Sequence, residues 1–188
     1  MIKSNSVLDA TGLACPMPIV KTKKTINGME PGQVLEIQAT DKGSTADMKA
    51  WSESTGHQYL GTIEEGKILK HYLRKSSGEE LTETKYESII SNHELQAHLE
   101  QNKNSIVLDV REAAEYAFNH IPSARSIPLG ELDERLGELD HDDEIFVICR
   151  TGSRSDLAAQ KLTSAGFKQV KNVLPGMSEW NGPVDSTT

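Results

Sequence analysis

A polar segment without hydrophobic periodicity, residues 75–85, divides the chain into two parts with different patterns. Its sequence, KSSGEELTETK, contains one large apolar residue and is typical of a linker. A length of 188 residues suits either one medium domain or two small ones, and this segment favours two. We therefore expect a first domain over residues 1–75, a linker over 76–86 and a second domain over 87–188.

The first part has the pattern of a small α+β domain with a two-layer architecture. Residues 34–39 alternate as a strand that faces one core. Residues 18–27 have helical spacing and are followed by Gly28, a frequent helix stop. The other expected elements are a short strand at 7–9, a helix at 45–55, and a closing hairpin made by residues 59–64 and 67–74.

The second part alternates strands and helices, which predicts an α/β fold with a doubly wound parallel sheet. Residues 106–108 and 145–148 are continuous apolar runs, as expected for strands buried on both faces. Ser91 and Glu94 have the spacing of a capping box and open a predicted helix that runs to Leu99. A further helix is expected at 155–165 and a third short strand at 170–173.

Charge and hydropathy exclude several classes of protein. Residues 1–75 carry 10 basic and 8 acidic residues, whereas residues 76–188 carry 10 and 20, so neither part has the basic surface of a nucleic-acid binder. No apolar stretch approaches the roughly 18 residues needed to cross a membrane. The N-terminal residues lack the apolar region of a secretory signal. We therefore expect no nucleic acid, no membrane and a cytoplasmic location.

The chain contains only two cysteines, Cys15 and Cys149, one in each part. The reducing cytosol argues against a structural disulfide between them. The six histidines show no zinc-ligand spacing with either cysteine, so we expect no metal. The two thiols are therefore the candidate reactive groups.

Cys149 directly follows the apolar run 145–148 and precedes a loop and a helix. This predicts a thiol at the carboxyl end of a parallel strand, where α/β sheets hold their ligands. Backbone amides of the loop, the N-terminus of the helix and the nearby Arg150 and Arg154 would favour a thiolate or a persulfide anion there. The alternative is an inert buried cysteine, and the two arginines argue against it.

Four motifs of the second part, in order, resemble the rhodanese family over about residues 86–185. They are LDVRE with EY at 108–116, HIPSA with IPL at 120–129, CRTGSR at 149–154 and LPGMSEW at 174–180. The resemblance implies that Cys149 carries a sulfane sulfur and that Asp109 and Arg111 support the site. It also implies a cradle of backbone amides around that sulfur, made by Arg150, Thr151, Gly152, Ser153 and Arg154.

The sequence departs from the rhodanese pattern at Asn119, Ser123 and Pro175, each of which stands where the family commonly has glycine. These departures concern turns rather than the active loop. Asp109 has an alternative role as a strand-end carboxylate paired with an arginine. His120 is expected to be a structural hydrogen-bonding residue rather than a base.

Phosphatase chemistry is the alternative interpretation of the loop that follows Cys149. Cysteine phosphatases have five residues between the cysteine and the arginine, whereas four residues separate Cys149 from Arg154. A shorter loop leaves less room for a tetrahedral phosphate, but it accommodates a single sulfur atom. The spacing therefore favours sulfur transfer.

Cys15 precedes Pro16 at the start of the helix predicted at 18–27, which would place the thiol at the N-cap. There the helix dipole and three lysines within two turns would favour a thiolate. The wider pattern resembles the TusA (SirA-like) sulfur-carrier family across residues 5–75, through DxxGLxCPxP at 9–18 and then Pro31, Gly32, Thr40, Asp41, Asp47, Trp51, Gly56 and His57. The resemblance implies a persulfide on Cys15, with Pro16 and Pro18 as supporting residues.

The two resemblances together imply a sulfurtransferase that moves sulfane sulfur through cysteine persulfides, with no cofactor beyond this covalent intermediate. The donor could be thiosulfate, a polysulfide, a low-molecular-weight persulfide or a protein persulfide, and the acceptor a protein. Either cysteine could load the other. The competing interpretations are a redox or reactive-sulfur sensor that forms a disulfide, and a non-enzymatic adaptor.

Overall fold

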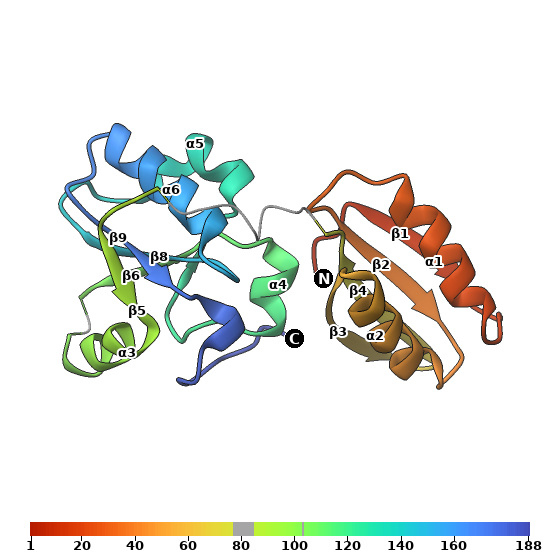
Figure 1. The fold of residues 1–188 in the computed structure, drawn as a ribbon. Coiled ribbons are helices and arrows are strands. Elements are labelled where there is room, and N and C mark those ends of the chain that lie inside the picture. Colours follow the sequence, from red (N-terminus) through yellow and green to blue (C-terminus); the bar gives the residue numbers. More distant parts are fainter. Residues whose placement is uncertain (77–84, 103) are drawn as a thin grey trace. The chain divides into compact units, whose positions relative to one another are not determined.

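The computed structural model describes residues 1–76, 85–102 and 104–188. The chain divides into two compact units, Met1–Gly78 and Glu79–Thr187. The mixed α/β fold class expected from the sequence is confirmed in both (Figure 1). Most of the predicted linker, 76–86, lies outside the described residues.

The first unit consists of a four-stranded sheet and two helices (Figure 1). The strand order is β1-β2-β4-β3, with β1 parallel to β2 and the other pairs antiparallel. The elements are β1 (Ser6–Ala10), α1 (Met17–Asn27), β2 (Val34–Ala39), α2 (Ser44–Thr55), β3 (Gln58–Glu65) and β4 (Ile68–Arg74). Apolar residues from both helices and from the sheet form a single core, which includes Ile26, Leu35 and Met48.

The second unit contains a five-stranded sheet, order β5-β9-β8-β6-β7, in which every neighbouring pair is parallel. Its strands are β5 (Ile89–Ser91), β6 (Ile106–Asp109), β7 (Arg125–Ser126), β8 (Glu144–Ile148) and β9 (Gln169–Leu174). Its helices are α3 (Asn92–Gln101), α4 (Ala113–Phe118), α5 (Leu132–Arg135) and α6 (Ser153–Ser164). The capping box of Ser91 and Glu94 opens α3 as expected.

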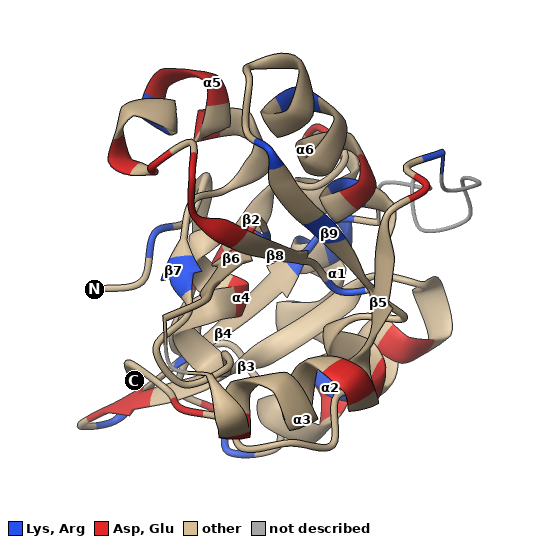
Figure 2. Cartoon of the chain, turned by 90° about the vertical axis from the view of Figure 1, so that its left-hand side faces the viewer, with Lys and Arg blue, Asp and Glu red and all other residues tan. Residues whose placement is uncertain are grey.

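Alternate residues of the central strands supply two separate cores. Leu108 and Val147 pack in the cluster that includes residues of α5 and α6, whereas Val107 and Phe146 pack in the cluster that includes Leu95 of α3. The sheet is therefore covered on both faces, which explains why the sequences of its central strands are continuous apolar runs. The excess negative charge of this unit gathers partly around α5, shown red in Figure 2.

Candidate active site

Cys149 lies directly after β8, between the strand and the first turn of α6. Because β8 is flanked by β9 and β6, the thiol is at the carboxyl end of a central strand, as the sequence predicts. Its side chain is fully buried. The amide N–H of Gly152 donates to Cys149 Sγ at 3.1 Å, and Ser155 Oγ lies 3.3 Å from the same sulfur.

The active loop, residues 149–152, depends on two glycines. Gly152 has a φ of +96° and is the N-cap of α6, and a Cβ at this position would collide with Leu174. Gly176 has a φ of +102°, and a Cβ there would lie 2.5 Å from the carbonyl oxygen of Cys149. Both backbones occupy a region that only glycine adopts readily. The loop is therefore closed tightly against the turn that follows β9.

That turn also binds the outer side of the active loop. The amides of Met177 and Ser178 donate to the carbonyl oxygens of Cys149 and Arg150 at 2.8 and 2.9 Å. Asn92, the first residue of α3, exchanges two hydrogen bonds with the backbone of Gly176. These bonds fix the turn and, through it, the loop that carries the thiol.

Two buried polar residues of the site, Ser155 and Asn172, were missed by the sequence analysis. Ser155 Oγ donates to Asn172 Oδ1 at 2.6 Å, and Asn172 Nδ2 donates to the carbonyl of Gly152 at 3.2 Å. Since Ser155 gives its only hydrogen to Asn172, its oxygen faces Cys149 as an acceptor. The one available signal was Asn172 itself, two residues after Val170 in β9 and so on the same buried face of the strand, because a buried amide needs partners.

Arg154 binds the carboxylate of Glu115, a residue of the EY motif to which the sequence analysis assigned no role. Its Nη1 and Nη2 bind Glu115 at 2.7 and 3.0 Å, and both side chains are buried. Burial opposes the positive charge, but the charge and hydrogen bonds of Glu115, together with the charges of Cys149 and Glu112, raise the pKa of Arg154. Glu115 also accepts from the amide of Glu112 in a capping box that opens α4. A role for Arg154 in holding sulfur stays a prediction.

The other predicted cradle residues differ in burial. Ser153 is buried, whereas Arg150 and Thr151 are half-buried. Arg150 accepts the amide of Ser178 through its carbonyl, so its backbone belongs to the fixed outer side of the loop.

Asp109 and Arg111 form a buried ion pair, the structural alternative considered for Asp109. Arg111 Nη2 lies 2.7 Å from Asp109 Oδ2, and Arg111 Nε also donates to this carboxylate. Burial opposes the charge, but the charge and hydrogen bonds of Asp109, together with the charge of Glu115, raise the pKa of Arg111. Arg111 further binds the side chain and carbonyl of Asn119, so this departure from the family's glycine has a structural partner.

His120 and Ser123 have structural roles. His120 Nδ1 lies 2.7 Å from the carbonyl oxygen of Tyr116, and the two rings stack at 3.8 Å. Ser123 has a φ of +67°, in the left-handed region where glycine is favoured. The departure at this position therefore affects a turn, as expected.

Cys15 lies one residue further from the helix than expected. The helix α1 begins at Met17, and Pro16 is its N-cap, so the prediction that Cys15 caps the helix is wrong. Pro16 has a φ of −97° and a ψ of 10°, which lets the proline take the flanking position itself. Cys15 and Pro16 are exposed, whereas Pro18 is buried beneath the first turn.

The electrostatic environment of Cys15 is also opposite to the prediction. A side-chain hydrogen bond to Asp47 raises the pKa of the Cys15 thiol, and burial and the charges of Asp47 and Asp41 act in the same direction. The Cys15 amide donates to Asp41 Oδ2 at 3.3 Å. The lysines of α1 are exposed. The charge of Lys21 instead adds to the hydrogen bonds from Thr11 that lower the pKa of Asp9. Asp41, which follows β2, and Asp47, which lies in α2, therefore affect the pKa of the thiol more than the positive end of α1 does.

Among the described residues, no group of three or more His, Cys, Asp or Glu side chains is placed to hold a metal ion. Within the same ranges, no helix has the length and apolar character required to cross a membrane.

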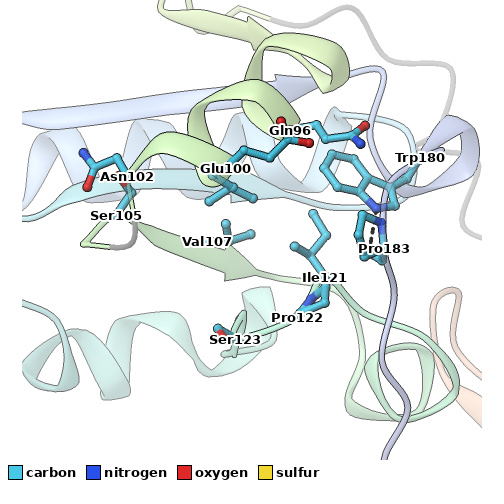
Figure 3. Close-up of a pocket in the computed structure, with 11 residues that line it drawn as sticks. Gln96, Glu100, Asn102, Ser105, Val107, Ile121, Pro122, Ser123, Trp180 and Pro183 are labelled. Atoms are coloured by element: carbon cyan, nitrogen blue, oxygen red, sulfur yellow. Dashed lines mark hydrogen bonds between the residues drawn. The ribbon is translucent and has the colours of Figure 1, made fainter.

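A pocket of about 410 Å³ between α3 and the segment 121–123 includes Trp180, whose indole donates to the carbonyl of Pro183 (Figure 3). Neither cysteine lines this pocket.

Comparison with known proteins identifies both units. Residues 6–75 match the family model of the sulfurtransferase TusA, and residues 91–183 match that of the rhodanese-like domain. The chain is 51% identical over 187 residues to the Bacillus subtilis protein named "Putative sulfur carrier protein YrkF", covering 98% of this chain and 100% of the relative. The predicted resemblances to TusA and rhodanese are thereby confirmed.

The second unit also matches shorter proteins. It is 40% identical over 93 residues to the B. subtilis protein named "Putative sulfurtransferase YtwF", which covers 50% of this chain and 89% of that protein. A rhodanese-like domain protein from Staphylococcus aureus superposes with a TM-score of 0.51 at 26% identity, over 54% of this chain and all of that protein. The chain therefore belongs to the family of sulfur-transfer proteins in which a TusA domain is followed by a rhodanese-like domain.

Proposed function

We propose that this protein is a sulfurtransferase that moves sulfane sulfur through cysteine persulfides, with Cys149 as nucleophile and Cys15 as carrier thiol. The observation that carries the proposal is the amide N–H of Gly152, which donates to Cys149 Sγ at 3.1 Å in a tight loop at a strand end. A fixed amide donor stabilises negative charge on sulfur in a buried site. The same loop favours a persulfide anion one atom further out.

With thiosulfate as donor, the Cys149 thiolate attacks the outer sulfur. The bond between the two sulfur atoms of thiosulfate breaks, sulfite leaves with the electron pair, and a new S–S bond forms on Cys149. An acceptor thiolate then attacks the terminal sulfur, and the Cys149 thiolate leaves. Both steps conserve electrons, so no external oxidant or reductant is required. A polysulfide, a low-molecular-weight persulfide or a protein persulfide can replace thiosulfate in the first step.

Cys15 serves as the acceptor or the supplier for Cys149 in this scheme. The part of its domain that the structure describes contains no second cysteine, and Cys15 is exposed near the end of the segment that joins β1 to α1. Exposure suits a thiol that must meet other proteins. We place this chemistry in the cytosol, where thiols are kept reduced.

The sensor hypothesis is disfavoured by the state of the two thiols. Redox-sensing cysteines combine a low pKa with exposure. Cys149 is buried, and carboxylates raise the pKa of the exposed Cys15. Neither thiol therefore combines the two properties.

The test compares full-length wild-type protein with Cys149→Ser and Cys15→Ser. We expect Cys149→Ser to abolish turnover of thiosulfate and cyanide, because a hydroxyl is rarely ionised and cannot hold sulfane sulfur. Cys15→Ser, the matched control, should retain this turnover. Intact mass after treatment with a sulfane donor should show reversible gain of one sulfur atom on each cysteine. Substantial turnover by Cys149→Ser would overturn the assignment of the nucleophile, and a wild-type protein that gains no sulfur would favour an adaptor.

A further inference from the structure

A network of buried hydrogen bonds ends at the thiol of Cys149. The carbonyl of Gly152 accepts from Nδ2 of Asn172 at 3.2 Å, and Oδ1 of the same amide accepts from Ser155 Oγ at 2.6 Å. Ser155 Oγ in turn lies 3.3 Å from Cys149 Sγ. The side chains of Asn172, Ser155 and Cys149 are all fully buried. Because a buried polar group needs a partner, the position of each hydrogen in this network is constrained.

The carbonyl of Gly152 sets the direction of the whole network. A carbonyl oxygen can only accept, so the Nδ2 end of the Asn172 amide must face Gly152 and its oxygen must face Ser155. Ser155 has one hydrogen and gives it to Asn172, so its oxygen presents only lone pairs to Cys149 Sγ. This arrangement suits a neutral thiol, whose S–H donates to Ser155 while the amide of Gly152 donates to the sulfur.

The thiolate of Cys149 requires a different arrangement. Once the sulfur has lost its hydrogen, the lone pairs of Ser155 face a negative charge and are repelled by it. The hydrogen of a hydroxyl group turns about its C–O bond, and an ionised sulfur is a stronger acceptor than a neutral amide oxygen. Ser155 therefore turns its hydrogen from Asn172 to the sulfur when Cys149 ionises.

We propose that Ser155 is a catalytic residue that donates to Cys149 Sγ only while this sulfur is charged, and that Asn172 is the positioning residue that holds the hydrogen at other times. This inference rests on the proposed function. It adds to that function a group that controls how readily Cys149 releases its sulfur.

The charge on Cys149 Sγ changes in each half of the reaction. In discharge, a thiolate or cyanide attacks the outer sulfur of the persulfide, the S–S bond breaks, and its electron pair stays on Sγ. Ser155 and the amide of Gly152 then both stabilise the leaving thiolate. In loading with thiosulfate, a pair on Sγ forms the new S–S bond, sulfite leaves with the negative charge, and Ser155 returns its hydrogen to Asn172. Neither half needs an oxidant or a reductant.

The first test measures discharge alone, in full-length protein with Cys15→Ser so that only Cys149 carries sulfur. Protein loaded with excess thiosulfate and desalted is mixed with cyanide, and quenched samples are analysed for thiocyanate and intact mass. We expect Ser155→Ala to slow discharge roughly three- to tenfold, less than a full hydrogen bond to a charged group provides, because wild-type Ser155 gives up its bond to Asn172. Ser164→Ala, the same change at the exposed end of α6, should have no effect.

The second test is the pH dependence of iodoacetamide reaction at empty Cys149, in the same Cys15→Ser background. Ser155→Ala should move the profile to higher pH by roughly half to one unit, because the thiolate loses a donor. Asn172→Leu removes the acceptor that competes for the Ser155 hydrogen, so it should move the profile to lower pH. A loosened loop would move both profiles in the same direction.

These substitutions leave the charges around the active loop unchanged. The charged groups there come from the loop itself, from α6, from the start of α4 and from the end of β6, and they are Arg150, Arg154, Glu112, Glu115, Asp109 and Arg111. A shift in the alkylation profile therefore reports the hydrogen bond to sulfur and not an altered ion pair.

The outcomes separate the inference from the proposed function. If wild-type Cys149 gains no sulfur, the proposed function fails, and the alkylation profiles still test the hydrogen bond. If Cys149 loads but Ser155→Ala discharges as fast as the wild-type protein, the inference is overturned and the proposed function stands. A shift to higher pH in Asn172→Leu would also overturn it, and this result decides alone if Ser155→Ala is too unstable to isolate.

Discussion

Both terminal nitrogens of Arg154 are bonded to Glu115, which joins α6 to α4 across the active loop. A buried carboxylate without its partner is strongly unfavourable, whereas the intact pair contributes little beyond what apolar residues of the same size would provide. Removal of Arg154 therefore has two consequences. It changes the charge near Cys149, and it leaves Glu115 buried and unpaired.

We expect Arg154→Ala to lower the free energy of unfolding of the second domain by about 3–5 kcal/mol. Urea denaturation followed through Trp180 measures this in the full-length protein with Trp51 replaced by Phe. Lys161→Ala is the control, because Lys161 pairs with Asp133 on the surface and such pairs contribute at most about 1 kcal/mol.

A double variant, Glu115→Gln with Arg154→Gln, removes both charges and should be more stable than Arg154→Ala. If Arg154→Ala unfolds like the wild-type protein and only its turnover falls, Arg154 acts on the sulfur alone and the ion pair has no structural role.

The immediate position of Cys149 was predictable because neighbouring residues determine it. An apolar run, a glycine and a helix follow one another in the sequence and place the thiol at a strand end. Ser155, Asn172 and Glu115 could not be assigned in this way. Asn172 reaches the loop from the next strand of the sheet, and Glu115 reaches it from α4, so their roles depend on tertiary packing.

The environment of Cys15 was mispredicted for the same reason. The sequence places lysines after the thiol and suggests a positive helix end. The carboxylates that act on it follow β2 and lie on α2, 26 and 32 residues further along the chain. The parallel pairing of β1 with β2 brings the ends of both strands together, and with them Cys15 and Asp41.

At the scale of elements, a chain of buried and partly buried hydrogen bonds joins α2 to β3 and β4 through His71. Ser44 Oγ donates to the carbonyl of Asp41 at 2.6 Å, so it accepts from His71 Nε2 at 2.8 Å. His71 Nδ1 then accepts from Thr62 Oγ1 at 2.6 Å, and Thr62 accepts from Tyr59. The chain holds His71 in one neutral tautomer and fixes the turn that presents Asp41.

This chain predicts acid sensitivity of the first domain. Burial lowers the pKa of His71 from 6.5 to about 4, so the unfolded state binds a proton more readily between these values. The contribution of neutral His71 to the free energy of unfolding of this domain should be fully present above pH 6.5. It should be lost as the pH falls towards 4, by about 3 kcal/mol in all. Urea midpoints at several pH values, followed through Trp51 in a Trp180→Phe background, measure the decline.

His71→Gln should lower stability at pH 7 but remove most of its dependence on pH in this window. His57→Gln, at a half-buried histidine of the same domain, should retain most of the dependence. An unchanged pH dependence in His71→Gln would assign the decline to other groups.

The expected elements of regular structure were confirmed wherever local periodicity was strong. The strand at 34–39 was predicted with its observed bounds, and α2 and β4 differ by one residue at their starts. The missed strands and α-helices are short: β5, β7, α4 and α5 span 3, 2, 6 and 4 residues. Segments of this length carry too little periodicity, and they form because the neighbouring strands and helices supply their partners.

At the scale of the whole molecule, each domain fastens its own end of the connecting segment. Lys75 exchanges backbone hydrogen bonds with Gln33 and Gly32 and donates through Nζ to the carbonyl of Met29. The amides of Lys85 and Tyr86 both donate to Asp156 in the first turn of α6. The distance between Lys75 and Lys85 cannot exceed about 35 Å, the reach of an extended chain of this length.

Such a connection predicts that sulfur passes between Cys149 and Cys15 within one chain. A short tether supplies an effective concentration in the millimolar range. In micromolar full-length protein, the transfer rate should therefore be independent of protein concentration. A mixture of Cys15→Ser, loaded at Cys149, with empty Cys149→Ser should transfer at a rate proportional to concentration.

Peptide mass at timed intervals gives both rates. If the wild-type rate also scales with concentration and equals that of the mixture, transfer occurs between separate molecules. If Cys15 gains sulfur from a small donor equally fast in Cys149→Ser, the two domains serve different partners.

The anchors at Lys75 and at Lys85 bear on how such a chain can arise by gene fusion. Every hydrogen bond described for these residues is made to their own domain. The amide of Ser76 likewise donates to His57 of the first domain, so two coding sequences could be joined or separated between Ser76 and Lys85 without loss of a described hydrogen bond in either fold. Selection could then act on the length of the joining segment alone, independently of the two chemistries it brings together.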